Sequence, residues 1–197
     1  LQEGMVPLRQ QHGARLLFAT VGGSGPLGEV VTAWAHDTRR QWADFDEALE
    51  LDPSWQSLAS KMSAHLRMQS RQILRTTDFT SAALPPQGTR LIDLRIYTFK
   101  PDGLATFLPV CASAGLPGQR RHCGDLVFHS TSISGPSDQL VQAWAYENHT
   151  QYDAGQRALF KDPSWAMDYR QRVIHLVDVQ EHRYLQTLSW SPTAAGS

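Results

Sequence analysis

The sequence has no apolar run near the roughly 20 residues that a membrane span needs, and it opens without a basic stretch leading into an apolar one. Only two of its 197 residues are cysteines, Cys111 and Cys123, which is too few for a disulfide framework. An excess of either charge is also absent, because 18 basic residues stand against 19 acidic ones. These absences predict a cytoplasmic protein with no membrane span and no nucleic-acid partner.

An internal repeat organises the sequence. Pairing residues 7–60 with 117–170, a shift of 110 without a gap, gives 18 identities in 54 positions. The tetrapeptide Asp-Pro-Ser-Trp at 52–55 recurs at 162–165, and Ala-Trp-Ala recurs at the same spacing. The chain, 41% hydrophobic and 19% charged, is therefore predicted to fold as two related copies of about 100 residues each.

The predicted domain boundaries follow from this alignment. The first copy takes residues 1–80 and the second takes 91–190, with a tail over 191–197. Residues 81–90 form the linker, because they lack periodicity and are rich in helix and strand breakers.

The second copy shows the order of elements. Residues 91–100 alternate apolar and polar side chains, the pattern of a strand, and a helical stretch follows. Residues 125–131 and 139–146 predict two strands joined by a turn, then helices, then a last strand over 184–190. The pattern β-α-β-β-α-β predicts a ferredoxin-like unit in the α+β class, with helices on one face of a sheet.

The first copy has no counterpart of residues 91–110, which hold the first strand and most of the first helix. A sheet without that strand leaves backbone groups unpaired in its interior. We therefore expect either that the gene product extends at least about 20 residues upstream, from the 110-residue offset, or that another chain supplies the strand. A homodimer is the alternative expectation for a protein partner.

Three motifs of the second copy, at 90–101, 142–146 and 162–165, resemble the NIPSNAP family in sequence and order. The resemblance implies the dimeric α+β barrel superfamily, with the two ferredoxin-like repeats forming a pseudo-dimeric barrel in one chain. Asp93 departs from it, since the family usually has Glu there, and His36 stands where the second copy has Tyr146. Members are linked to vesicle traffic and mitochondrial signalling, and relatives in the superfamily include cofactor-free monooxygenases, haem enzymes and isomerases, so the resemblance implies a fold and no single reaction.

Strand alternation places Asp93, Arg95 and Tyr97 on one face, which we expect to line the barrel interior while the aliphatic residues between them meet the helices. Arg95 could hold a carboxylate or enolate there, and Tyr97 could donate a proton. The competing interpretation is that Arg95 pairs with Asp93 or a helix end and that the tryptophans are core residues.

Further candidates come from the other strands. The residues expected on the same pocket are Gln142, Trp144 and Tyr146 from the second copy and Thr32, Trp34 and His36 from the first. His36 can transfer protons near neutral pH, and His129 could face the pocket as well. His12 and His122 recur at the 110-residue offset, which indicates a shared structural hydrogen bond rather than chemistry.

Cofactor signals are weak. The eight histidines and two cysteines show no spacing typical of a metal site, so no metal or other cofactor is predicted. Haem bound through one axial histidine stays an alternative, because it needs only one ligand and an apolar pocket.

Two functional hypotheses remain open. The first is an enzyme that binds a small, mostly apolar organic molecule in the barrel, with Arg95, Tyr97, Tyr146 and His36 as catalytic candidates for a cofactor-independent oxygenase, isomerase or lyase. The other candidate residues would bind the substrate. The second is a non-catalytic binding or adaptor module that acts through protein–protein contacts. An enclosed cavity would favour the first hypothesis, and a filled barrel with an outer apolar patch would favour the second.

Overall fold

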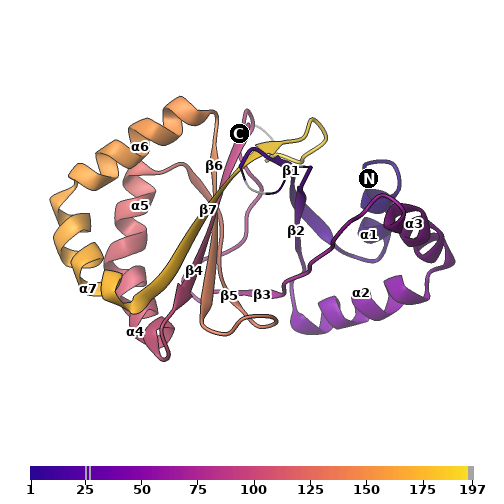
Figure 1. The fold of residues 1–197 in the computed structure, drawn as a ribbon, viewed down its shortest axis with the longest axis horizontal. Coiled ribbons are helices and arrows are strands. Elements are labelled where there is room, and N and C mark those ends of the chain that lie inside the picture. Colours follow the sequence, from indigo (N-terminus) through magenta and orange to yellow (C-terminus); the bar gives the residue numbers. More distant parts are fainter. Residues whose placement is uncertain (25, 27, 195–197) are drawn as a thin grey trace.

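The computed structural model describes residues 1–24, 26 and 28–194 (Figure 1). The described strands form one antiparallel sheet in the order β2-β1-β7-β4-β6-β5-β3. Their bounds are β1 (Arg15–Gly22), β2 (Val30–Ala35), β3 (Leu74–Thr76), β4 (Leu91–Phe99), β5 (Asp125–Ser132), β6 (Gln139–Tyr146) and β7 (Val177–Thr187).

Helices lie on the two outer sides of the strands. One group holds α1 (Met5–Gln11), α2 (Arg39–Leu51) and α3 (Pro53–Ser63). The other holds α4 (Gly103–Val110), the π-helical segment η1 (Cys111–Gly115), α5 (Leu116–His122), α6 (His149–Lys161), the π-helical segment η2 (Trp165–Arg170), α7 (Gln171–Val173) and the 3-10 turn η3 (Ile174–Leu176). Figure 1 shows the strands between these groups, which confirms the predicted α+β class. No helix in the described part of the chain has both the length and the apolar character of a membrane span.

The hairpins β1–β2 and β5–β6 share one register, displaced by 110 residues. Leu16 pairs with Trp34 as Leu126 pairs with Trp144, and a register shift follows directly in both strands. The second helical segment after each hairpin also begins in the same way, because the Asp52 and Asp162 side chains each accept a hydrogen bond from the backbone N–H two residues on. Matching residues at the same positions of the two halves thus give the same register and the same helix start.

The two halves exchange their last strands. β7, at the end of the second half, pairs with β1 of the first half, and β3, at the end of the first half, pairs with β5 of the second. β4 is central, since it pairs antiparallel with both β6 and β7. This exchange gives the pseudo-dimeric barrel arrangement that the sequence predicts.

One strand boundary was predicted wrongly. The last strand begins at Val177 and ends at Thr187, not at 184–190. Its first part is mostly exposed and carries Asp178, Glu181 and Arg183, so apolar alternation is weak there. This part of β7 is held by its pairing with β4, whose edge opposite β6 accepts β7 along the whole length of β4.

Candidate functional site

The odd-numbered residues of β4 face the helices, not the barrel interior as predicted. Tyr97 packs in a cluster with residues of α4, η1, α6 and η2, and Asp93 and Arg95 share its face. The aliphatic residues between them fill the interior, where Ile92 and Leu94 pack with Phe18, Val127 and Leu185. Both faces of the central strand are buried, so alternation shows which residues share a face but not which layer covers it.

Asp93 is fully buried, and hydrogen bonds satisfy both of its carboxylate oxygens. The Arg95 Nε–H donates to Oδ2 at 2.6 Å, and the His182 Nδ1–H donates to Oδ1 at 3.1 Å. Burial acts to raise the pKa of Asp93, but the His182 hydrogen bond and the Arg95 charge outweigh it and lower that pKa. Asp93 is therefore a buried carboxylate that fixes the orientation of His182, the arrangement called here the Asp93–His182 dyad.

Arg95 lies beneath the dyad and is also buried. Burial acts to lower its pKa, but the neighbouring Tyr97 and Asp93 reverse this and raise it, so the guanidinium stays charged. Its carbon Cζ lies 5.7 Å from the centre of the Trp144 ring, and an N–H donates to the Tyr146 hydroxyl at 3.5 Å. The competing sequence interpretation, an Arg95–Asp93 pair, is what the structure contains.

The tyrosines of this face are weak acids in this setting. Burial raises the pKa of Tyr97, of Tyr146 and of Tyr152, which keeps each phenol protonated near neutral pH. The Tyr152 and Tyr184 hydroxyls lie 2.9 Å apart and share a hydrogen bond. These groups can donate hydrogen bonds to an oxygen, but they do not act as bases.

Gln180 covers the outer side of the dyad. Its side-chain amide donates to His182 Nε2 and to the Tyr97 hydroxyl, the latter at 3.5 Å. Gln180 is exposed and the His182 side chain is 26% exposed, whereas Asp93 is inaccessible. The dyad therefore connects a buried charge to the protein surface through one imidazole.

Gln142 is buried in the same layer with one polar atom unsatisfied. Its Oε1 accepts the Trp144 indole N–H at 3.0 Å, but its Nε2 has no hydrogen-bond partner within the described residues. A buried unpaired amide costs free energy, which makes this layer receptive to an added hydrogen-bond acceptor.

His129 lies deeper on the helix side and does not line an open pocket. Its Nδ1 is 3.1 Å from the Thr77 hydroxyl and its Nε2 is 3.5 Å from Cys111 Sγ. Burial lowers the pKa of His129 to about 4 and raises that of Cys111 to about 12. The pair is neutral and unreactive, and because both imidazole nitrogens are engaged, His129 does not fit an axial haem ligand.

The predicted residues of the first half lie elsewhere. The Trp34 indole N–H donates to Thr32 Oγ1 at 3.0 Å, and the centre of the His36 ring lies 4.6 Å from that of Phe45 of α2, with the two rings tilted by 50°. Two strands, β1 and β7, separate β2 from β4 in the sheet order. The predicted convergence of His36 with Arg95 on one pocket is therefore wrong.

His182 is the candidate residue that sequence reasoning missed. It lies opposite Arg95 on β7, in a segment that precedes the predicted last strand, 184–190. One sequence pattern could have predicted it. Gln180, His182 and Tyr184 are spaced two residues apart and share one face of a strand, so they extend the predicted strand toward its N-terminus.

The paired histidines have the structural role that their recurrence indicates. His12 Nε2 lies 2.9 Å from Asp52 Oδ2, and His122 Nε2 lies 2.9 Å from Asp162 Oδ2. Each imidazole thus joins the end of one helix, α1 or α5, to the aspartate that starts the second helical segment after it.

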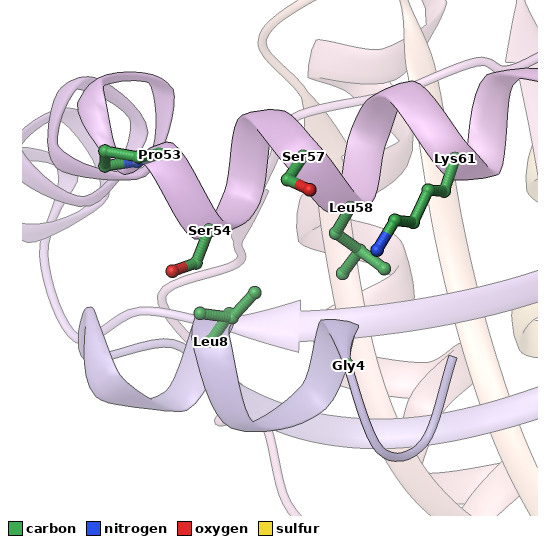
Figure 2. Close-up of a pocket in the computed structure, with 7 residues that line it drawn as sticks. All are labelled: Gly4, Leu8, Pro53, Ser54, Ser57, Leu58 and Lys61. Atoms are coloured by element: carbon green, nitrogen blue, oxygen red, sulfur yellow. The ribbon is translucent and has the colours of Figure 1, made fainter.

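Two surface grooves lie away from the Asp93–His182 dyad. One is between α1 and α3, with Leu8 on the α1 side and Leu58, which points toward Gly4, on the α3 side (Figure 2). The other, of about 670 Å³, lies where β4 begins and includes Arg90, His149 and Thr187. Within the described residues no cluster of three or more His, Cys, Asp or Glu side chains could hold a metal ion.

Comparison with known structures places the fold first. The "putative monooxygenase" of Fusobacterium nucleatum aligns over 100% of this chain and 88% of its own at 10% identity, with a TM-score of 0.63. An anthrone oxidase-like protein aligns over 99% of this chain and 88% of its own, also at 10% identity, with a TM-score of 0.56. The fold is that of the dimeric α+β barrel class.

Within that class the chain belongs to the NIPSNAP family, whose family model matches residues 92–192. A NIPSNAP-like domain protein from Burkholderia xenovorans is 25% identical over 55% of this chain and 94% of its own, with a TM-score of 0.52. A NIPSNAP family protein from Agrobacterium tumefaciens is 24% identical over 56% and 98%, with a TM-score of 0.51. No curated protein matches the sequence.

Proposed function

We propose that the protein binds a small, mostly apolar organic molecule carrying a carbonyl or anionic oxygen, and that it transfers a proton to or from that molecule through His182. The observation that carries this proposal is the Asp93–His182 dyad, in which a buried carboxylate orients a partly exposed imidazole. Such a pair is a common design for general acid–base catalysis near neutral pH.

Each neighbouring residue has a role that fits its burial. Arg95 is too deep to meet a ligand first, so it keeps Asp93 ionised and thereby keeps His182 in one orientation. The Tyr97 hydroxyl, which the same Gln180 amide contacts, would donate a hydrogen bond to a substrate oxygen. Gln180 also occupies His182 Nε2, so substrate binding would displace it.

The proposed site lies on the helix side of the sheet, at the edge formed by β7, and not in the barrel interior. Aliphatic side chains fill the interior around Ile92 and Leu94. Abstraction of a proton beside a carbonyl is a first step shared by cofactor-independent oxygenases, isomerases and lyases, so the dyad is compatible with all three.

The test is ligand-dependent thermal stabilisation together with proton exchange. The ligands are fractions of a metabolite extract and anthrone, an apolar ketone chosen because one structural neighbour is an anthrone oxidase-like protein. We expect stabilisation of the unmodified protein and deuterium uptake beside the carbonyl. His182→Gln and Asp93→Asn should abolish the uptake, whereas Gln180→Ala should retain it.

The matched control is His175→Gln, because His175 is an exposed histidine of the same half that lies outside the dyad. It should behave as the unmodified protein. Absence of any ligand-dependent shift, or full uptake in His182→Gln, would contradict the proposal. An absorbance scan from 350 to 700 nm of the purified protein tests the haem alternative separately.

The adaptor hypothesis has one specific observation in its favour, which is the filled barrel interior. An adaptor would lose no function on substitution of His182 and would be recognised through an outer surface. Retention of partner binding in His182→Gln, with no ligand-dependent stabilisation of the unmodified protein, would favour this second function.

A further inference from the structure

The two ends of the sheet are related strands. β2 is the counterpart of β6 and β3 is the counterpart of residues 184–186 in β7, each 110 residues earlier. In the second half, β4 lies between β6 and β7 and pairs with both. In the first half, β2 pairs with β1, β3 pairs with β5, and no described strand pairs with their other edges.

We propose that the free edges of β2 and β3 together form a binding slot for one extended polypeptide strand with the chemistry of β4. The occupant is a segment of about nine residues in which aliphatic side chains alternate with polar or aromatic ones. It would pair antiparallel with both edges, as β4 does with β6 and β7.

The edge of β2 carries none of the features that protect an edge strand. Its sequence, Val30 to Ala35, contains no proline, no lysine and no other charge, and three of its six residues are β-branched. Natural edge strands usually carry such protecting residues. Val30 is 45% exposed, whereas its counterpart Leu140, which pairs with Tyr97 of β4, is fully buried.

The interior side of the slot is apolar. Val31, Ala33 and Leu74, from the two edges, are partly buried against the same interior cluster that holds Ile92 and Leu94. A strand between β2 and β3 would therefore place its aliphatic side chains on an existing apolar cluster. Burial of that surface is the main favourable contribution expected from binding.

The helix side of the slot is equally incomplete. Trp34 and Trp55 are half-buried, whereas their counterparts Trp144 and Trp165 are buried. The Arg9 guanidinium lies over these rings, 4.8 Å from the centre of Trp34, and its buried Nε has no partner in the described part of the chain. A polar side chain from the occupant, as Asp93 provides for Arg95, would satisfy this group.

The test uses a synthetic peptide with the sequence of residues 90–100, blocked at both ends, added to the full chain. Backbone amide exchange is measured with and without the peptide. We expect one peptide to bind per chain, the amides of β2 and β3 to exchange roughly tenfold or more slowly, and the melting temperature to rise. The amides of β6 should not change.

Two N-methylated peptides test whether both edges are used. Residues of a strand direct their N–H groups alternately to opposite edges, so methylation at Ile92, Leu94 and Ile96 blocks one edge, and methylation at Asp93, Arg95 and Tyr97 blocks the other. Insertion into the slot predicts that both peptides lose binding. If only one of the two methylated peptides loses binding, the peptide adds to a single edge and the proposal of a two-edged slot is wrong.

Two other outcomes would overturn the proposal. One is protection of β2 in the absence of peptide that grows with protein concentration, which would assign this edge to self-association. The other is failure of the unmethylated peptide to slow exchange in β2 and β3.

Discussion

Trp34 and Trp144 occupy the same position in the two halves and differ in burial. Each donates its indole N–H to the residue two before it, and each pairs with a leucine across the same hairpin register. Trp144 is fully buried beneath helices and beside β4, whereas Trp34 is half-buried. Local sequence therefore sets strand register, and the neighbouring central strand sets burial.

The electrostatic arrangement differs in the same way. In the second half, Arg95 and Asp93 neutralise each other inside the layer. In the first half, Arg9 reaches into the aromatic cluster, no described carboxylate bonds its Nε, and burial lowers its pKa. The chemistry proposed for this protein therefore belongs to the second half alone.

The largest difference between the halves should come from the paired tryptophans. Trp144→Ala should lower the free energy of unfolding by about 4 kcal/mol, because it leaves a cavity in a closed core. Trp34→Ala should cost roughly half as much, since part of that ring already meets solvent. Denaturant unfolding of both variants measures this, and equal costs would contradict the difference in burial.

Breaking the buried ion pair should have the next largest effect. Arg95→Ala leaves the Asp93 carboxylate with His182 as its remaining partner, and we expect a loss of about 3 kcal/mol. The matched control is Arg183→Ala, which removes the half-exposed pair with Glu29 and should cost under about 1 kcal/mol. If chemical denaturation gives a similar loss for the two variants, the Arg95–Asp93 pair is not isolated from water.

Acid should destabilise the second half through His129, whose counterpart in the first half is Ala19. Burial lowers the pKa of His129 from 6.5 to about 4, so the unfolded chain binds the proton first as pH falls. Stability should fall between pH 6.5 and 4 by no more than about 3 kcal/mol, with no contribution from this group above pH 6.5. His129→Gln should reduce that slope, and an unchanged slope would exclude His129 as its source.

The smallest effects should come from the two helix-starting aspartates. Asp162→Ala should lower the melting temperature more than Asp52→Ala, because Asp162 also accepts a hydrogen bond from Arg121. Hydrogen bonds lower the pKa of both carboxyls, from Ser164 foremost in Asp162 and from His12 foremost in Asp52. Their contribution is present above the unfolded pKa near 4 and is lost as pH falls through the lowered values. A larger shift in Asp52→Ala, by calorimetry, would reverse this ranking.

Much of the fold could be predicted from local sequence. Alternation over 91–99 located β4, and the motif at 162–165 located a helix start with a capping aspartate and a following proline. The recurrence of His12 and His122 predicted that each makes a structural hydrogen bond. Each of these features depends on residues a few positions apart or on a direct match between two stretches.

The candidate site could be predicted only in part. Asp93, Arg95 and Tyr146 do come together, but the layer that covers them depends on tertiary packing, which alternation does not report. His182 was missed because its strand segment is held by pairing with β4 rather than by its own apolar pattern. His36 was placed wrongly because symmetry between copies does not bring equivalent residues together.

The two halves share one register, but only the second encloses its core, and amide hydrogen exchange of β2 against β6 in the unmodified protein measures this difference. We expect slow exchange along β6, which has a strand on both edges, and much faster exchange along β2, which has one among the described strands. Equal protection of β2 and β6 in the monomeric protein would contradict it.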